Sequence, residues 1–287
     1  MPDRRNMLSA DRTTIRPVSD PTLSPWFPML YRPPLRSSRA ARWSRRLGGL
    51  AVPLVIITLI AHRLDLVATP EAIVLAGIAF CLGLVAIVAA LVGLAVVWER
   101  GFEGARNAAF GLIYATLALS PAIYGGYAAA TNPALSDIST DWANPPLYVE
   151  AQALRGGHLN GVAPPSPDRI ELQQRVYPDI ATRHFGIGSE QLFRSVKKVV
   201  ERNGWKILGE TVPKEDGERG RIEAVARTPV FGEENDVVIR ILAEPAGAKI
   251  DMRSSSRYGS HDLGQNAARI RSFFTALEAA VAENFGQ

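Results

Sequence analysis

Long runs of apolar residues set the first half of the chain apart from the second. Residues 72–98 form 27 consecutive positions without one charged side chain. As a helix, this run would be about 40 Å long, which exceeds the roughly 30 Å of hydrocarbon in a bilayer. It also lacks the polar stripe that a surface helix of a water-soluble protein carries. The pattern therefore predicts a transmembrane helix and an integral membrane protein.

Two further apolar runs flank this one. Residues 47–67 are apolar up to a charged segment at the far end, where Arg63 can extend its guanidinium to the membrane surface. Residues 108–130 carry Tyr124 and Tyr127 near their exit, where tyrosine suits the membrane interface. We therefore predict three transmembrane helices. The middle helix has a face of small residues that suits close helix packing: Ala86, Ala89, Ala90 and Gly93.

The arginines predict which way the helices cross. Residues 1–46 contain ten arginines, three aspartates and no lysine, and we predict them to be a disordered tail. The loop after the second run carries Arg100 and Arg106, whereas the loop after the first carries Arg63 alone. Because positive loops stay in the cytoplasm, the amino terminus is predicted to be cytoplasmic.

Three crossings divide the chain into a basic cytoplasmic tail (1–46), a three-helix membrane region (47–130) and a soluble domain (131–287). The domain then lies across the membrane from the tail. In a bacterium with two membranes this means an inner-membrane protein with a periplasmic domain. If the first run does not cross, the domain lies on the same side as the tail.

The soluble half alternates between helical and strand patterns. A helix is predicted over residues 189–203, where Ser189 suits an N-cap and Gly204 suits the end. A second helix is predicted from a cap near Asp262 to residue 284. Between them lie four runs of alternating polarity, typical of an antiparallel meander: 205–212, 221–228, 236–243 and 248–257.

These elements predict an α+β fold in two layers: a four-stranded antiparallel sheet with two helices on one face. The proline-rich residues 131–170 are predicted to be extended loop. Both helices need an apolar sheet face to pack on, and one face of the third and fourth strands supplies it: Val237, Ile239, Ile241, Ile250 and Met252.

Charge and composition limit the possible partners. Residues 1–130 hold 13 Lys and Arg against 7 Asp and Glu, while residues 131–287 hold 19 against 21. The positive excess therefore lies beside the membrane, which argues against nucleic acid as the partner. The single cysteine, Cys81, excludes a disulfide within the chain. The histidines lack metal-ligand spacing and no nucleotide-binding motif occurs, so we predict no metal and no cofactor.

The opposite sheet face is predicted to present Arg240 and Arg253 among apolar residues. Such a face suits an anionic or amphipathic ligand, for example a lipid or an envelope polymer. The favoured alternative is a solvated sheet face with cross-strand ion pairs.

The turn between Arg257 and Arg269 is the other candidate site. Asp262 precedes a predicted helix, and Asn266 and Arg269 lie one helical turn apart. Either an anion site or a structural clamp would explain these residues. We favour the clamp, with Arg257 pairing to Asp262 or to Asp141.

Three motifs resemble the DUF1499 family. They are Asp137 to Asp141 followed by residues 144–146, then Tyr177-Pro178-Asp179, then residues 256–266 with Arg269. The resemblance covers about residues 132–285. It implies a family of uncharacterised function, often found in cell envelopes, and membrane anchors occur on some of its members.

Together these patterns predict a non-catalytic, membrane-anchored protein whose domain binds an envelope component: a lipid, an anionic polymer or a protein partner. One alternative is a periplasmic hydrolase that uses Asp141, Asp262 and the nearby arginines. Another is a structural subunit of a membrane complex.

Overall fold

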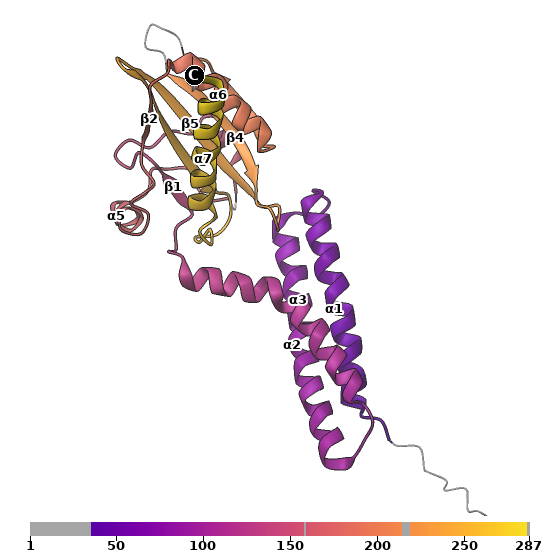
Figure 1. The fold of residues 1–287 in the computed structure, drawn as a ribbon. Coiled ribbons are helices and arrows are strands. Elements are labelled where there is room, and N and C mark those ends of the chain that lie inside the picture. Colours follow the sequence, from indigo (N-terminus) through magenta and orange to yellow (C-terminus); the bar gives the residue numbers. More distant parts are fainter. Residues whose placement is uncertain (1–35, 158, 214–218, 286–287) are drawn as a thin grey trace, which may run out of the picture.

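A computed structural model describes residues 36–157, 159–213 and 219–285. These residues form a long helical bundle joined to a domain built around a β-sheet (Figure 1). Most of the predicted disordered tail, residues 1–35, lies outside the described residues.

Three long helices form the bundle: α1 (Arg39–Arg63), α2 (Thr69–Arg100) and α3 (Ala105–Thr131). All three are long and apolar enough to cross a membrane, which confirms the three predicted helices. The first begins inside the segment assigned to the tail. Ser38 caps it, because the Ser38 hydroxyl accepts a hydrogen bond from the Ala41 N–H at 3.3 Å.

Small residues let the helices pack closely. Ala86, Ala90 and Gly93 of the predicted small-residue face are buried in the bundle. A Cβ atom added at Gly93 would lie 2.7 Å from the backbone nitrogen of Ala41. Only glycine fits at such a contact, as expected for membrane helices whose backbones approach each other.

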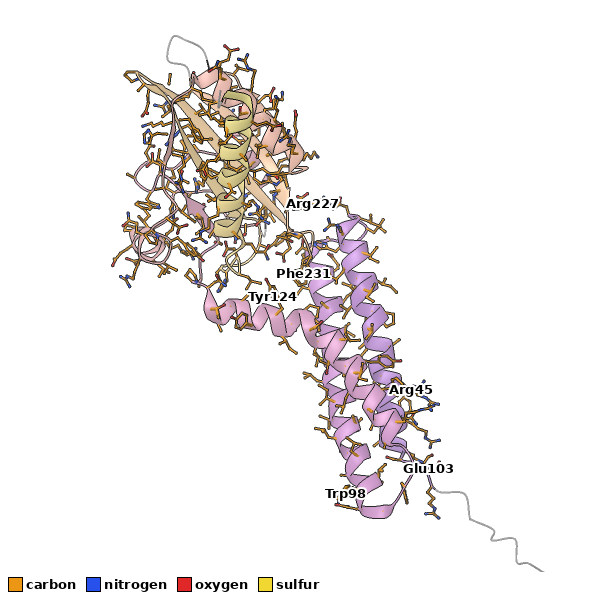
Figure 2. The ribbon with its side chains drawn as sticks, viewed as in Figure 1. Arg45, Trp98, Glu103, Tyr124, Arg227 and Phe231 are labelled. Carbon is orange, nitrogen blue, oxygen red and sulfur yellow. The ribbon has the colours of Figure 1, made fainter. Side chains whose placement is uncertain are left out.

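Helix α3 leaves the bundle partway along its length. Pro121 lies inside it and has no N–H to donate to the Leu117 carbonyl, which instead accepts a hydrogen bond from the Ser120 hydroxyl at 2.8 Å. Beyond this point the helix bends away and runs toward the sheet domain, with Tyr124 exposed on it (Figures 1 and 2). The ends of α1 and α2 nearest the sheet domain therefore do not have α3 packed against them.

The sheet has six antiparallel strands rather than the four predicted. The four predicted strands are present as β3 (Lys206–Thr211), β4 (Gly220–Arg227), β5 (Glu234–Glu244) and β6 (Gly247–Ser256). The order along the sheet is β1-β6-β5-β4-β3, and β2 also pairs with β6. The two additional strands are three residues each: β1 (Asp137–Ser139) and β2 (Arg183–Phe185).

The segment predicted to be extended loop is therefore partly regular. It contributes β1 and two short helices, α4 (Glu150–Leu154) and the start of α5 (Pro167–Val176). These elements were missed because strands and helices this short leave no periodic pattern.

Two helices, α6 (Ser189–Arg202) and α7 (Gln265–Phe285), cover one sheet face as predicted. Trp205 stacks on Phe273 of α7, with ring centroids 5.7 Å apart. The five residues predicted for the sheet's core face are all fully buried: Val237, Ile239, Ile241, Ile250 and Met252.

The opposite face is covered as well, so its predicted exposure to solvent is wrong, whereas a predicted cross-strand ion pair is present between Arg240 and Asp251. Tyr148 and Ala151 pack against Val238 there. Arg253 is 0% exposed and Arg240 is 8% exposed. The chain between β1 and α5 crosses this face and forms a third layer over it.

Candidate functional site

Three of the predicted site residues, Arg240, Arg253 and Arg257, lie in buried clusters of ion pairs. Arg253 projects from β6 beneath the covering layer. Its guanidinium lies 2.5 Å from the Asp137 carboxylate and donates to the Pro146 carbonyl at 3.2 Å and the Ala163 carbonyl at 3.0 Å. It also lies 5.0 Å from the centre of the Tyr148 ring. Arg253 therefore fastens the covering layer to the sheet.

Arg240 forms a neighbouring cluster. One guanidinium nitrogen lies 2.8 Å from both the Asp141 and the Asp251 carboxylates. Asp251 also accepts a hydrogen bond from the Thr182 hydroxyl at 2.5 Å. Two acidic side chains therefore hold Arg240 in place, one from the motif loop and one from β6.

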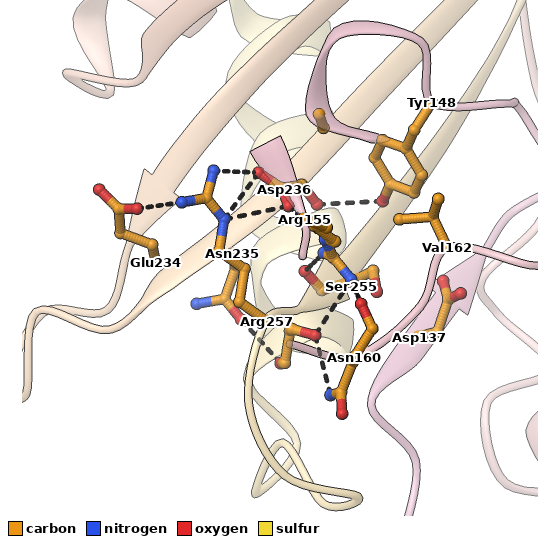
Figure 3. Close-up of polar contacts among 12 residues, drawn as sticks. Asp137, Tyr148, Arg155, Asn160, Val162, Glu234, Asn235, Asp236, Ser255 and Arg257 are labelled. Atoms are coloured by element: carbon orange, nitrogen blue, oxygen red, sulfur yellow. Dashed lines mark hydrogen bonds and ion pairs between the residues drawn. The ribbon is translucent and has the colours of Figure 1, made fainter. Parts of the chain in front are cut away.

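Arg257 belongs to a third cluster, which is centred on Asp236 (Figure 3). The Asp236 carboxylate is fully buried and lies 2.7 Å from Arg257 and 2.6 Å from Arg155. Arg257 also pairs with Glu234. The expected pairing of Arg257 with Asp262 or Asp141 is therefore wrong. The strand register explains this, because β5 places Asp236 opposite Ser255, two residues before Arg257.

Asp262, Asn266 and Arg269 come together at the start of α7. The Asp262 carboxylate accepts the backbone N–H groups of Gly264 at 2.8 Å and Asn266 at 2.9 Å, so it caps the helix as predicted. Arg269 donates to the Asn266 side-chain oxygen at 2.6 Å and to the Ser254 hydroxyl at 2.9 Å. Burial raises the pKa of the Asp262 carboxyl and lowers the pKa of Arg269 to about 10.

The remaining motif residues lie beside α7, where Tyr177 is buried and Pro178 and Asp179 are exposed. Asp179 pairs with Arg271 at 2.6 Å, and both side chains are about half exposed. Arg271 lies 5.1 Å from the centre of the Tyr177 ring, while Pro178 is exposed between the two motif residues. The pair ties the turn after α5 to the last helix.

These clusters keep their charges close to partners of opposite charge. Asp141 and Asp262, the acids of the predicted hydrolase, lie in separate clusters. A cavity of about 320 Å³ beside the third cluster is lined by Ser136, Asp137 and Arg169 but by neither of those acids. Within the described residues, no three His, Cys, Asp or Glu side chains gather as a metal site would require.

A second cavity, of about 390 Å³, lies where the bundle meets the domain. We call it the junction cavity. It occupies the space that α3 vacates when it bends at Pro121. Its lining comes from α1, α2, α3 and the domain: Val55, Thr58, Leu59, His62, Thr69, Ala72, Ile73, Ala76, Gly77, Phe80, Pro121, Ala122, Gly125, Phe231, Glu233, Leu263 and Gln265.

Most of this lining is apolar, but three buried polar atoms stand out. Thr58 Oγ1, His62 Nε2 and Gln265 Oε1 have no hydrogen-bond partner among the residues that the structure describes. The Thr58 side chain is well buried, since the residue is 4% exposed. Buried polar atoms are rarely left unpaired, so each one needs an explanation.

Glu233 adds a carboxyl group to the same cavity. It follows the turn between β4 and β5, where its backbone N–H donates to the Thr228 hydroxyl at 3.0 Å. Burial raises the pKa of the Glu233 carboxyl, and His62 opposes the rise. Glu233 and His62 thus line the same cavity.

Contacts on two sides hold the domain over the cavity. Arg63, at the end of α1, donates to the Pro229 carbonyl at 2.6 Å, and Arg227 lies 2.8 Å from Asp65 in the loop before α2. On the other side, His261 lies 3.1 Å from the carbonyl of Asn132, just after α3. Figure 2 shows Arg227 and Phe231 where the domain meets the bundle.

The sequence did not predict the junction cavity, because its walls come from segments far apart in the chain. Two signals pointed toward it: a proline inside the third apolar run, and Thr58 inside the first. Neither residue alone predicts the direction in which α3 bends or the cavity that the bend creates.

Comparison with known proteins identifies the domain and little else. Residues 137–277 match a family model described as a protein of unknown function, DUF1499. One similar solved structure is the X-ray crystal structure of protein MLL2253 from Mesorhizobium loti, which is 13% identical in sequence with a TM-score of 0.26. The match covers 36% of this chain and 96% of the MLL2253 chain. A similarity this low supports no argument. None of the curated proteins compared with the chain matches it.

Proposed function

Because residues 137–277 belong to the DUF1499 family, whose function is unknown, we propose a function from the geometry: this is a membrane-anchored binding protein that holds an amphipathic component of its own membrane in the junction cavity. Three helices long and apolar enough to cross a membrane support a position for the cavity at the edge of the bilayer. The domain covers it from outside the membrane.

The observation that carries this proposal is the set of orphaned polar atoms at an apolar cavity. About 390 Å³ falls within the usual range for small-ligand sites, which are mostly apolar with a few polar groups that orient the ligand. Thr58, His62 and Gln265 supply those groups. A ligand with an apolar chain and a polar head would satisfy both parts of the cavity.

The buried clusters support binding rather than catalysis. Arg240, Arg253 and Arg257 are each held by carboxylates, so their charges stabilise the covering layer and are not offered to a substrate. An anionic ligand on the sheet face would first have to displace that layer. The junction cavity needs no such opening of the domain.

We further propose that the membrane is the inner membrane of a cell envelope, with the domain in the periplasm. Figure 2 shows Arg45 and Glu103 at the end of the bundle away from the domain. Arginines that flank a helix favour the cytoplasmic side. On this orientation the cavity lies at the level of the outer leaflet.

Two adjacent glycines of α3 provide the test. A Cβ atom added at Gly125 or at Gly126 would meet nothing within 4 Å, so a larger side chain fits at either position. Gly125 lines the cavity, whereas Gly126 is not among the residues that line it. We expect Gly125→Leu to fill the cavity and Gly126→Leu to leave it open.

The measurement is the lipid that stays bound to the full chain after purification in detergent, identified by mass spectrometry. Gly125→Leu should retain about ten-fold less than the natural protein, because its side chain occupies the ligand's volume. Gly126→Leu should retain as much as the natural protein. Equal retention by both variants would show that the cavity is not the binding site.

A further inference from the structure

We infer that the ligand of the junction cavity carries an uncharged, hydroxylated head, as an acylglycerol or a long-chain alcohol does. This inference rests on the proposed function and narrows it to one chemical class. It follows from which polar atoms the cavity offers and which it lacks.

Most of the orphaned atoms accept hydrogen bonds. His62 Nδ1 lies 3.1 Å from the Val67 carbonyl oxygen, and a carbonyl can only accept, so Nδ1 carries the hydrogen. In the neutral ring Nε2 therefore offers a lone pair. Gln265 Oε1 also accepts. A head group that matches these two atoms must donate hydrogen bonds.

Thr58 is the exception, because its hydroxyl can both donate and accept. Its orphaned oxygen lies one helical turn before His62 on α1, and both residues line the cavity. A ligand hydroxyl can donate to His62 and accept from Thr58 at the same time. A head with only acceptors would leave His62 Nε2 and Gln265 Oε1 unpaired, whereas an ammonium head, which could donate to all three atoms, would bring a charge into a mostly apolar cavity at a cost in desolvation.

Charge argues against an anionic head. Among the described residues that line the cavity, none is lysine or arginine, while Glu233 contributes a carboxyl group. The two arginines of the junction are already engaged, Arg63 by the Pro229 carbonyl and Arg227 by Asp65 and Glu234. A phosphate or carboxylate head would therefore enter without a lysine or arginine to pair with it.

The apolar lining defines the rest of the ligand. Val55 and Phe80 form walls deeper in the bundle, and Phe231 closes the cavity from the domain side. The polar atoms thus lie toward the domain and the apolar walls toward the bilayer. A ligand with one hydrocarbon chain and a small polar head fits this arrangement of polar and apolar walls.

The test uses three probes that share one chain length and differ in the head: monooleoylglycerol, oleate and oleylamine. Each is added to the purified full chain in detergent, and bound probe is measured by equilibrium dialysis and by native mass spectrometry. We expect monooleoylglycerol to bind at least about ten-fold more tightly than either charged probe, because its head pairs with the orphaned atoms without bringing a charge into a mostly apolar cavity.

Variants of the polar atoms test the cause of that preference. Thr58→Val and Gln265→Leu should each reduce the preference for monooleoylglycerol over the charged probes to about three-fold or less. Thr58→Ser keeps the hydroxyl and should keep the preference of about ten-fold. Thermal unfolding of each variant identifies any that fails to fold. Thr58→Ser then shows whether a hydroxyl at that position matters independently of side-chain size.

The outcomes separate this inference from the proposed function. Tighter binding of oleate or oleylamine would overturn the hydroxylated head. Equal binding of all three probes, abolished by Gly125→Leu, would overturn it as well and would keep the cavity as a site for apolar chains. Binding that Gly125→Leu leaves unchanged would overturn both.

Discussion

Asp236 is a fully buried carboxylate that receives two arginines, Arg155 and Arg257. Arg155 also donates to the backbone carbonyl of Ser255 at 2.9 Å and to that of Asn160 at 3.0 Å. The acid therefore connects β5 and β6 to the layer that covers them. Ion pairs this deeply buried are costly to break, because the remaining charges lose their partner.

We expect Asp236→Ala to lower the free energy of unfolding by roughly 3–5 kcal/mol, since it leaves the buried Arg155 guanidinium without a carboxylate and leaves Arg257 with Glu234 alone. Glu171→Ala is the matched control. Its ion pair with Arg175 is 70% exposed on both sides, and its loss should cost less than about 0.5 kcal/mol. Chemical unfolding of the full chain, followed by tryptophan fluorescence, measures both. A loss for Asp236→Ala as small as that of the control would contradict a cooperative network.

Glu233 makes stability depend on pH. Burial raises the pKa of its carboxyl in the folded protein above the value of 4.5 taken for the unfolded chain. The folded state therefore binds the proton more readily. Its stability is retained below about pH 4.5 and falls as the pH rises through the folded-state pKa.

Glu233→Gln removes this titration, and we expect the variant to gain stability over the natural protein as the pH rises from 4 to 8. Thermal unfolding of both proteins across that range is the measurement. The difference between them should be smallest at the acid end. A constant difference at every pH would contradict the assigned burial effect.

Within the elements, α1 and α3 also approach each other closely, at Gly111. A Cβ atom added at Gly111 would lie 1.6 Å from the Ser44 hydroxyl oxygen and 2.9 Å from the Ser44 carbonyl carbon. The hydroxyl can rotate away, but the backbone carbon cannot move without shifting the helix. Close packing at this position thus requires glycine.

Gly111→Ala is expected to destabilise the bundle by about 1–3 kcal/mol through overpacking. Gly126→Ala lies on the same helix with open space around it and should not lower stability, because alanine favours helices over glycine. Thermal unfolding in detergent, followed by circular dichroism, compares them. If the two variants unfold at the same temperature, α1 and α3 are farther apart at Gly111 than in the structure.

Elements with a long periodic pattern were predictable from the sequence. The three apolar runs, α6, α7 and the four long strands all produce such patterns, and their buried faces follow from the same alternation. The strands β1 and β2 do not, because three residues cannot show a period. Their presence depends on the unpaired edge of β6, which exists only after the sheet has formed.

The candidate site was less predictable for a similar reason. Arg240 and Arg253 were correctly predicted to lie on the second sheet face. The sequence around them does not indicate that the chain between β1 and α5 covers this face and buries both side chains. The partners of Arg257 depend on the register of β5 against β6. The junction cavity depends on the direction that α3 takes after Pro121, and a proline predicts a bend without a direction.

For the whole molecule, the contacts at the junction relate the domain to the membrane. Arg227 of β4 pairs with Asp65, so the loop between α1 and α2 lies on the same side as the domain. The loop between α2 and α3, with Glu103, lies at the opposite end of the bundle (Figure 2). The start of α1 pairs with that loop, since the Ser38 N–H donates to the Glu103 carbonyl at 2.9 Å.

A reporter that is active only in the cytosol tests the predicted orientation. Fused after Gln287 it should be inactive, and fused before Met1 it should be active, because three crossings place the two ends on opposite sides. Expression of both fusions must be equal by immunoblot. Activity after Gln287 would place the domain in the cytosol and would withdraw the periplasmic assignment.

The connection between α3 and β1 is short: Thr131 ends one element and Asp137 begins the other, with five residues between them. A fully extended tether of that length reaches about 17 Å. If every contact between the domain and the bundle opened, these five residues would still limit how far β1 could move from the end of α3. That limit is shorter than the roughly 30 Å of hydrocarbon in a bilayer. In the proposed membrane setting, the domain therefore reaches only the membrane surface beside α3, and a ligand destined for another membrane would need a separate carrier.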